Sequence, residues 1–160
     1  MPLLEFTLAE LARVESMPPP DYLQRRLRIL VVDDESSIRE VVATTLREEG
    51  HFVETAVDGL DGLEHFRRGA WDVVLTDRAM PGLSGEQLAA EIKIAAPYLP
   101  VIMLSGFSPS QSGSVGQPLA ADMLISKPFR LETIRAAVIE AAQMYSGVSE
   151  RSDEDEQAVG

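Results

Sequence analysis

Five short runs of apolar and β-branched residues divide the chain, and polar side chains follow four of them directly. The four runs cover residues 28–32, 71–76, 101–104 and 123–126. Runs of this length and composition, bounded by turn-forming residues, predict buried strands. A further short strand is predicted at 52–56. The polar residues that follow the four runs are Asp33 and Asp34, Asp77, Ser105, and Lys127.

Between these runs, apolar residues recur at helical spacing and predict amphipathic helices. Asp58 is expected to cap the second of these helices, and Ser84 with Gln87 forms a capping box at the start of the third. Strands that alternate with helices predict an α/β fold with a parallel sheet covered on both faces. The expected inward-facing residues are Ile38, Val41, Val42 and Leu46; Leu60, Leu63 and Phe66; Leu88, Ile92 and Ala95; and Leu131, Ile134, Val138 and Ala142.

The segment between the fourth and fifth strands breaks this alternation. Residues 106–118 hold three glycines and two prolines. Relative to alanine, each glycine costs a helix about 1 kcal/mol and each proline about 3 kcal/mol. We therefore expect the fourth helix to be short or irregular.

Both ends of the chain differ from the central part. Thr7 and Glu10 match a capping box, which predicts a short helix at 7–16 before the prolines at 18–20. Such a helix either docks on a surface or is a loosely held extension, because so short a helix is marginal alone. Acidic residues crowd 147–160 and predict a disordered, solvated tail. The expected units are an N-terminal extension at 1–27, a domain at 28–146 and this tail.

Composition narrows the range of functions. The apolar share of 45% supports a packed core, whereas the net charge of −12 argues against direct binding of nucleic acid or anionic membrane. The chain has no cysteine, which excludes disulfides and thiolate metal sites. It shows neither a signal-peptide pattern nor an apolar stretch that could span a bilayer, so we expect a cytoplasmic protein.

The polar groups at the strand ends predict a site. In an open parallel sheet the carboxyl ends of the strands lie along one edge, where ligands bind. Asp33, Asp34 and Asp77 would repel one another there, and a hard divalent cation, Mg²⁺ or Mn²⁺, relieves that repulsion. A cation beside Ser105 and Lys127 would create a place for a phosphoryl group. Helix capping is the alternative role for the adjacent aspartates.

These residues and their order resemble the receiver domain of response regulators, the phosphorelay proteins of two-component signal transduction. The resemblance extends over about 28–144 and includes the segments Val31–Glu35, Thr76–Gly85, Leu104–Gly106 and Lys127–Phe129. It implies a flavodoxin-like, doubly wound sheet of five parallel strands in the order 2-1-3-4-5.

The resemblance also implies a metal site and a phosphorylation site. Asp77 corresponds to the phosphoacceptor, whose carboxylate would form an aspartyl phosphate. Asp34 and Asp77 would bind Mg²⁺ directly and Asp33 mainly through water, and the backbone carbonyl of Ala79 would supply a further ligand.

Other positions of the family pattern concern the phosphoryl group and the response to it. Lys127 and Ser105 would contact the phosphoryl oxygens, and Ser105 would move toward them as part of a switch. Leu124 stands where an aromatic switch residue is usual, so the aromatic response is not expected here. Ala79 and Phe107 flank the path of attacking water and both lack a polar group, which predicts slow loss of the phosphate.

The implied function is a phosphoprotein switch or relay that receives its phosphoryl group from a histidine kinase or a histidine phosphotransfer protein. It would act on a downstream protein, without DNA-binding output, and would catalyse only its own phosphorylation and dephosphorylation. The receiver segment of a hybrid sensor histidine kinase is an alternative. A homodimer through the fifth strand and the last two helices is also open, although the run 106–118 alters that face.

Two alternative functions, an enzyme and a binding module, remain. A Mg²⁺-dependent phosphatase with an aspartate nucleophile uses similar groups, but it needs an Asp-x-Asp spacing that Asp33-Asp34-Glu35 lacks. A degenerate receiver that only binds partners would fail to bind Mg²⁺. His51 and His65 do not lie at predicted strand ends, so neither is a candidate for phosphotransfer.

Overall fold

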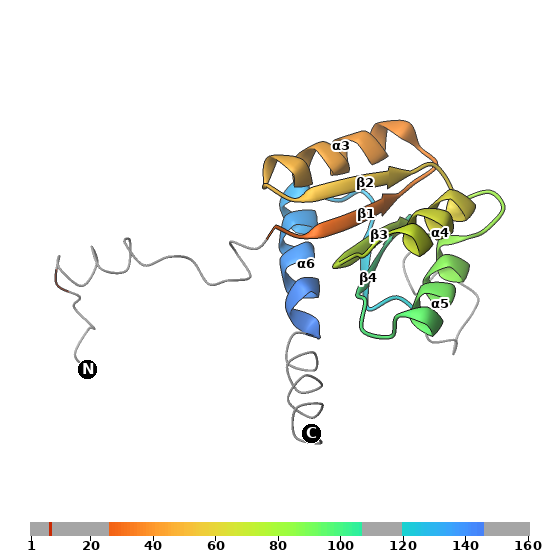
Figure 1. Cartoon of the computed structure of the whole chain (residues 1–160). Helices are drawn as coiled ribbons and strands as arrows, with labels where there is room; N and C mark the ends of the chain where they lie inside the picture. The colour runs from red at the N-terminus through yellow and green to blue at the C-terminus, as the bar shows by residue number, and fades with distance from the viewer. Residues whose placement is uncertain (1–6, 8–25, 107–119, 146–160) are drawn as a thin grey trace, which may run out of the picture.

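The computed structural model describes residues 7, 26–106 and 120–145, and these form a five-stranded parallel sheet with helices on both faces (Figure 1). The strand order is β2-β1-β3-β4-β5, as the family resemblance implies. The strands are β1 Arg28–Val32, β2 Phe52–Ala56, β3 Val73–Asp77, β4 Val101–Ser105 and β5 Met123–Ser126. The helices are α3 Ser36–Glu48, α4 Gly59–Arg68, α5 Gly85–Ala95 and α6 Leu131–Met144.

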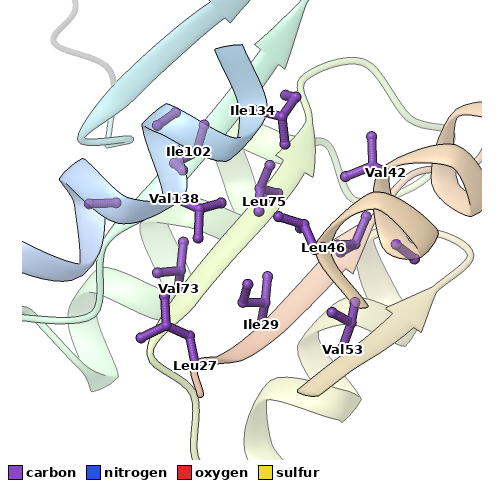
Figure 2. Close-up of a cluster of buried hydrophobic side chains, with 14 of the residues drawn as sticks. Leu27, Ile29, Val42, Leu46, Val53, Val73, Leu75, Ile102, Ile134 and Val138 are labelled. Atoms are coloured by element: carbon purple, nitrogen blue, oxygen red, sulfur yellow. The ribbon is translucent and has the colours of Figure 1, made fainter. Parts of the chain in front are cut away.

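Two hydrophobic clusters hold the layers together, one on each face of the sheet. Helices α3 and α6 cover one face, where Leu46 and Val138 meet Ile29 and Leu75 of the central strands (Figure 2). Helices α4 and α5 cover the opposite face (Figure 1). Because β3 and β4 are buried along their whole length, they begin with continuous apolar runs, Val73–Leu75 and Val101–Leu104, rather than with alternating residues. The predicted fold class is therefore confirmed.

The predicted helix starts are confirmed at α4 and α5. The side chain of Asp58 accepts a hydrogen bond from the backbone N–H of Asp61 at 2.8 Å. Ser84 and Gln87 form the reciprocal capping box, in which each side chain bonds the backbone N–H of the other. Local polar residues thus define where these helices begin, because they satisfy N–H groups that have no partner within the helix.

Four of the predicted inward-facing residues are wrong. Val41 is 50% exposed and Leu60 is 64% exposed, and Ala95 and Leu131 also lie at the surface. In α4 the buried positions are Gly59 and Gly62 instead of Leu60. The other predicted residues do contact the hydrophobic clusters, so the error is confined to one position in each helix. In α4 the periodicity missed the glycines, because glycines carry no hydrophobic signal although they allow the closest helix packing.

Several sequence predictions concern residues outside those that the structure describes. These are the helix at 7–16, most of the extension at 1–27, the tail at 147–160 and the irregular segment between β4 and β5, of which residues 107–119 are not described. Within the described ranges, none of the helices has the length and apolarity that a membrane crossing requires.

Candidate functional site

The strand ends bring the predicted site residues to one edge of the sheet. Asp77 is the last residue of β3 and pairs in register with Leu104, while Ser105 ends β4 and pairs with Ser126 of β5. Asp33 follows β1 and its backbone N–H bonds the carbonyl of Ala56. Residues far apart in the sequence therefore share one edge, as expected for parallel strands.

Three carboxylates form the centre of this edge. One oxygen from each of Asp33, Asp34 and Asp77 lies within 4.8 Å of the others. Asp33 is 1% exposed and Asp77 is 8% exposed, whereas Asp34 faces solvent. Three anions this close, two of them shielded from water, repel one another strongly unless a cation or a proton intervenes.

The electrostatic cost of this arrangement falls mainly on Asp33. Its Oδ1 accepts a hydrogen bond from the backbone N–H of Glu35 at 2.9 Å, but its buried Oδ2 has no hydrogen-bond donor among the described residues. Burial, reinforced by the nearby charge of Asp77, raises the pKa of Asp33 to about 6, although the Glu35 N–H and Lys127 favour the charged form. Asp33 is the group that gains most from a cation.

Lys127 supplies the positive charge at this edge. Its Nζ lies 3.1 Å from Asp77 Oδ1 and 3.8 Å from Asp33 Oδ2. The backbone N–H of Lys127 bonds the carbonyl of Ser105 at 2.7 Å, and the peptide bond to Pro128 is cis. The ammonium thus faces the carboxylate cluster from β5, which places it beside any group bound to Asp77.

Two glycines pack closely against the backbone of the loop between β3 and α5. A Cβ on Gly85 would lie 1.9 Å from the carbonyl oxygen of Asp77, and one on Gly59 would lie 2.1 Å from the carbonyl oxygen of Leu83. The N–H of Gly85 also bonds the carbonyl of Arg78 at 2.9 Å. This packing fixes the backbone on both sides of Ala79, and the sequence analysis did not identify these glycines as contact points.

Two arginines near the site were also missed. Arg39, in the second turn of α3, donates from Nη1 to the carbonyl of Asp33 at 2.8 Å. Arg78 follows Asp77 and pairs with Glu86 of α5 at 2.8 Å. Each basic residue lies within a few residues of an aspartate of the cluster, which is a sequence signal that could have found them.

The remaining predicted residues lie around this cluster. Ser105 is fully buried at the end of β4, and Ala79 is exposed in the loop that follows Asp77. Leu124 is partly buried and packs against the hydrophobic cluster beneath α5. Phe107 lies outside the described residues.

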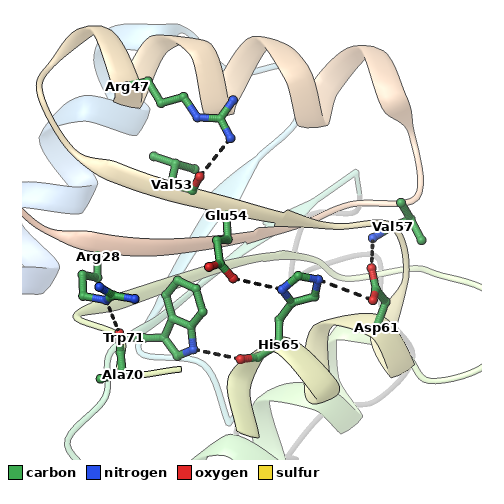
Figure 3. Close-up of polar contacts among 9 residues, drawn as sticks. All are labelled: Arg28, Arg47, Val53, Glu54, Val57, Asp61, His65, Ala70 and Trp71. Atoms are coloured by element: carbon green, nitrogen blue, oxygen red, sulfur yellow. Dashed lines mark hydrogen bonds and ion pairs between the residues drawn. The ribbon is translucent and has the colours of Figure 1, made fainter. Parts of the chain in front are cut away.

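Both histidines have structural contacts away from this edge. The ring of His65 lies between Glu54, 3.0 Å from Nδ1, and Asp61, 3.5 Å from Nε2, and its carbonyl accepts a hydrogen bond from Trp71 (Figure 3). His51 Nδ1 accepts a hydrogen bond from the backbone N–H of Leu27 at 3.1 Å. Neither of these contacts involves the cluster of Asp33, Asp34 and Asp77.

The arrangement fits a hard divalent cation. Asp33 Oδ2 is buried and receives no hydrogen bond from the residues that the structure describes, and carboxylates from Asp34 and Asp77 converge on the same small space. Oxygen ligands without histidine or cysteine are those that Mg²⁺ prefers. With Lys127 alongside, the edge combines a cation site with an ammonium group, an environment that suits a phosphoryl group.

Comparisons with known proteins agree with this geometry. The family model for the response regulator receiver domain matches residues 29–139. The transcriptional regulatory protein DltR of Streptococcus agalactiae is 36% identical over 130 residues, which cover 76% of this chain and 58% of DltR.

Among solved structures, a response regulator receiver domain protein from Clostridium thermocellum has a TM-score of 0.69 at 31% identity and covers 76% of this chain and 98% of its own. The response regulator TrrA from Thermotoga maritima, solved with Mg²⁺ and BeF, has a TM-score of 0.65 at 36% identity and covers 72% of this chain and 98% of its own.

Proposed function

Because this chain belongs to the response regulator receiver family of two-component systems, we propose that Asp77 is its phosphoacceptor and that the phosphoryl group comes from a histidine kinase or a histidine phosphotransfer protein. The observation that carries this proposal is the contact of Lys127 Nζ with Asp77 Oδ1 at 3.1 Å, inside a cluster of three carboxylates. In this proposal the chain catalyses only its own phosphorylation and dephosphorylation.

In the proposed reaction, one carboxylate oxygen of Asp77 attacks the phosphorus of the donor. A new P–O bond forms while the P–N bond of phosphohistidine breaks, and the imidazole leaves with a proton taken up from solvent. Lys127 holds an equatorial phosphoryl oxygen with its ammonium group, and Ser105 offers a hydroxyl donor from the end of β4. The product is an aspartyl phosphate.

The residues that would hold the cation are Asp34 and Asp77 directly, Asp33 mainly through water, and the backbone carbonyl of Ala79. Bound Mg²⁺ would neutralise charge on the carboxylates and the phosphoryl oxygens. The fold restrains the position of the Ala79 carbonyl, because Gly85 packs against the carbonyl of Asp77 and thereby restrains the loop that carries Ala79.

Incubation with acetyl phosphate and Mg²⁺, followed by intact-mass measurement, tests this function. We expect wild-type protein to gain the mass of one phosphoryl group and Asp77→Asn to gain none. Asp33→Asn with Asp77 intact serves as the second variant. Turnover of a phosphomonoester that is abolished by Asp33→Asn and retained in Asp77→Asn would contradict the proposal and support the phosphatase alternative.

The output of the chain is a separate part of the proposal. Several relatives, DltR among them, are named transcriptional regulators, and the chain spans a little over half the length of DltR. We propose a downstream protein as the target, because a net charge of −12 disfavours contact with DNA phosphates. Retention of duplex DNA by the chain at physiological salt would contradict this proposal.

We expect the aspartyl phosphate of the wild-type protein to persist for minutes or longer in the presence of Mg²⁺. Ala79 is exposed beside the site and offers no polar group to orient a water molecule. Ala79→Gln adds an amide there and is expected to accelerate loss of the phosphate roughly tenfold, less than a positioned acid or base supplies. Phosphate released after removal of the donor measures the rate. Ala79→Leu is the matched apolar control, and loss from wild type within seconds would contradict the prediction.

A further inference from the structure

Strand β5 is held by a charged group at each end. Lys127 follows its last residue and contacts Asp77 at the phosphoacceptor edge. Asp122 precedes its first residue, Met123, and lies at the opposite end of the sheet. Four residues, Met123–Ser126, separate them, so the Cα atoms of Asp122 and Lys127 lie about 17 Å apart at the usual rise of a strand. Within the described part of the chain, β5 is an edge strand that pairs with β4 alone, so it has fewer backbone partners than the central strands.

The carboxylate of Asp122 is the centre of a polar network unrelated to the aspartate cluster. Its Oδ2 accepts hydrogen bonds from the backbone N–H of Val101 at 2.8 Å and from Lys93 Nζ, and its Oδ1 accepts one from the hydroxyl of Tyr145. The side chains of Lys93 and Asp122 are both largely buried. Three donors on one shielded carboxylate make a strong, specific attachment.

Neither Asp122 nor Tyr145 changes its protonation state near physiological pH. Burial alone would raise the pKa of Asp122, but the hydrogen bonds from Lys93, Tyr145 and Val101 together hold it below its ordinary value. The hydrogen bond to Asp122 raises the pKa of Tyr145 to about 12. Asp122 is therefore ionised and the hydroxyl of Tyr145 remains a donor.

The same network reaches the C-terminal end of α6. Tyr145 is the first residue after α6, and its ring lies 5.1 Å from Lys93 Nζ and makes an edge contact with the ring of Tyr98 at 5.7 Å. Lys93 comes from the last turn of α5 and also donates to the carbonyl of Leu99 at 2.8 Å. Asp122 thus joins the start of β5 to the ends of α5 and α6.

We infer that Asp122 and Tyr145 form a latch through which β5 couples the state of Asp77 to the C-terminal end of α6. This inference rests on the proposed phosphorylation of Asp77. A phosphoryl group on Asp77 places anionic oxygens beyond the carboxylate that Lys127 now contacts, so the ammonium moves outward to follow them. Because Lys127 and Asp122 flank one short strand, that movement draws Asp122 away from Tyr145.

The hydroxyl of Tyr145 is the contact that is released first. Val101 remains close to Asp122 because β4 pairs with β5, and Lys93 remains close because its ammonium group attracts the carboxylate. Tyr145 has neither restraint, since it stands at the end of a helix. Coupling of this kind is reciprocal. A latch that resists movement of Lys127 weakens binding of a phosphoryl group, and removal of the latch strengthens it.

The test compares the full-length wild-type protein with Tyr145→Phe and Tyr98→Phe. Tyr145→Phe removes only the latch hydroxyl and keeps the ring beside Lys93. Tyr98→Phe is the matched control, because it removes a hydroxyl from the ring in contact with Tyr145 without touching Asp122. Each protein is titrated with beryllofluoride, a phosphoryl mimic, in the presence of Mg²⁺, and affinity is measured by calorimetry. Amide hydrogen exchange at residues 140–145 is the second readout.

We expect Tyr145→Phe to bind beryllofluoride about fivefold more tightly than wild type, at the lower end of typical coupling between sites. Tyr98→Phe should match wild type. Beryllofluoride should speed amide exchange at the end of α6 in wild type but not further in Tyr145→Phe. Equal or weaker binding by Tyr145→Phe, with wild-type binding intact, would overturn the latch alone. Absence of binding by wild type would overturn the proposed function and the latch with it.

Discussion

Replacing Asp33 with asparagine is expected to raise the free energy of unfolding of the metal-free protein by about 1–3 kcal/mol at neutral pH and to weaken Mg²⁺ binding by more than about tenfold. The stability gain follows from the burial of an oxygen, Oδ2, that has no hydrogen-bond donor among the described residues. An amide at this position carries no charge, so burial beside Asp77 costs less.

The sign of the pH dependence follows from the raised pKa of Asp33. The folded state holds its proton up to a pH of about 6, whereas the unfolded chain releases it near 3.8. The contribution of Asp33 to stability therefore falls as the pH rises from about 4 to about 6 and stays low above that range. The stability difference between Asp33→Asn and wild type should grow over the same interval. Urea unfolding without metal, at several pH values, measures it.

Asp34→Asn is the matched control for this prediction. Asp34 belongs to the same carboxylate cluster but is exposed, so its charge is already solvated. We expect Asp34→Asn to lose Mg²⁺ affinity without a comparable gain in stability. If both variants were equally stable, or if Asp33→Asn were less stable than wild type at neutral pH, burial of the Asp33 carboxylate would not be the cause.

Gly85→Ala is expected to destabilise the protein by about 3 kcal/mol or more and to abolish phosphorylation of Asp77. The added Cβ would lie 1.9 Å from the carbonyl oxygen of Asp77 and 2.9 Å from Cα of Arg78. Both are backbone atoms, so no side-chain rotation can relieve the clash. The chain after Asp77 must shift, and this would displace the Ala79 carbonyl from the proposed cation site.

Thermal unfolding and intact-mass measurement after treatment with acetyl phosphate test both parts of this prediction. Gly106→Ala is the control for stability, because a Cβ at Gly106 meets no atom of the described residues within 4 Å and the backbone has no positive φ. We expect it to unfold like wild type. A Gly85→Ala protein with wild-type stability would show that the loop yields easily and that the close approach does not position the site.

Much of the fold could be predicted from the sequence because the signals are local. The β-branched runs, with polar or turn-forming residues at their ends, marked β1, β3, β4 and β5 to within two residues. Asp58 and Ser84 marked helix starts, since each satisfies N–H groups in its own first turn. Glycine-mediated packing was missed for the same reason: Gly59 has no apolar side chain, so the periodicity selected Leu60, which is exposed.

The sequence by itself determined which chemical groups end each strand, because alternation of strand and helix forces parallel strands and brings their carboxyl ends to one edge. It could not determine the environment of those groups. Only the tertiary structure decided that Asp33 is buried while its neighbour Asp34 is solvated. The tertiary structure also decided that Asp122 bonds to Tyr145. These residues belong to separate elements, and they share an environment of low dielectric only once the layers have packed.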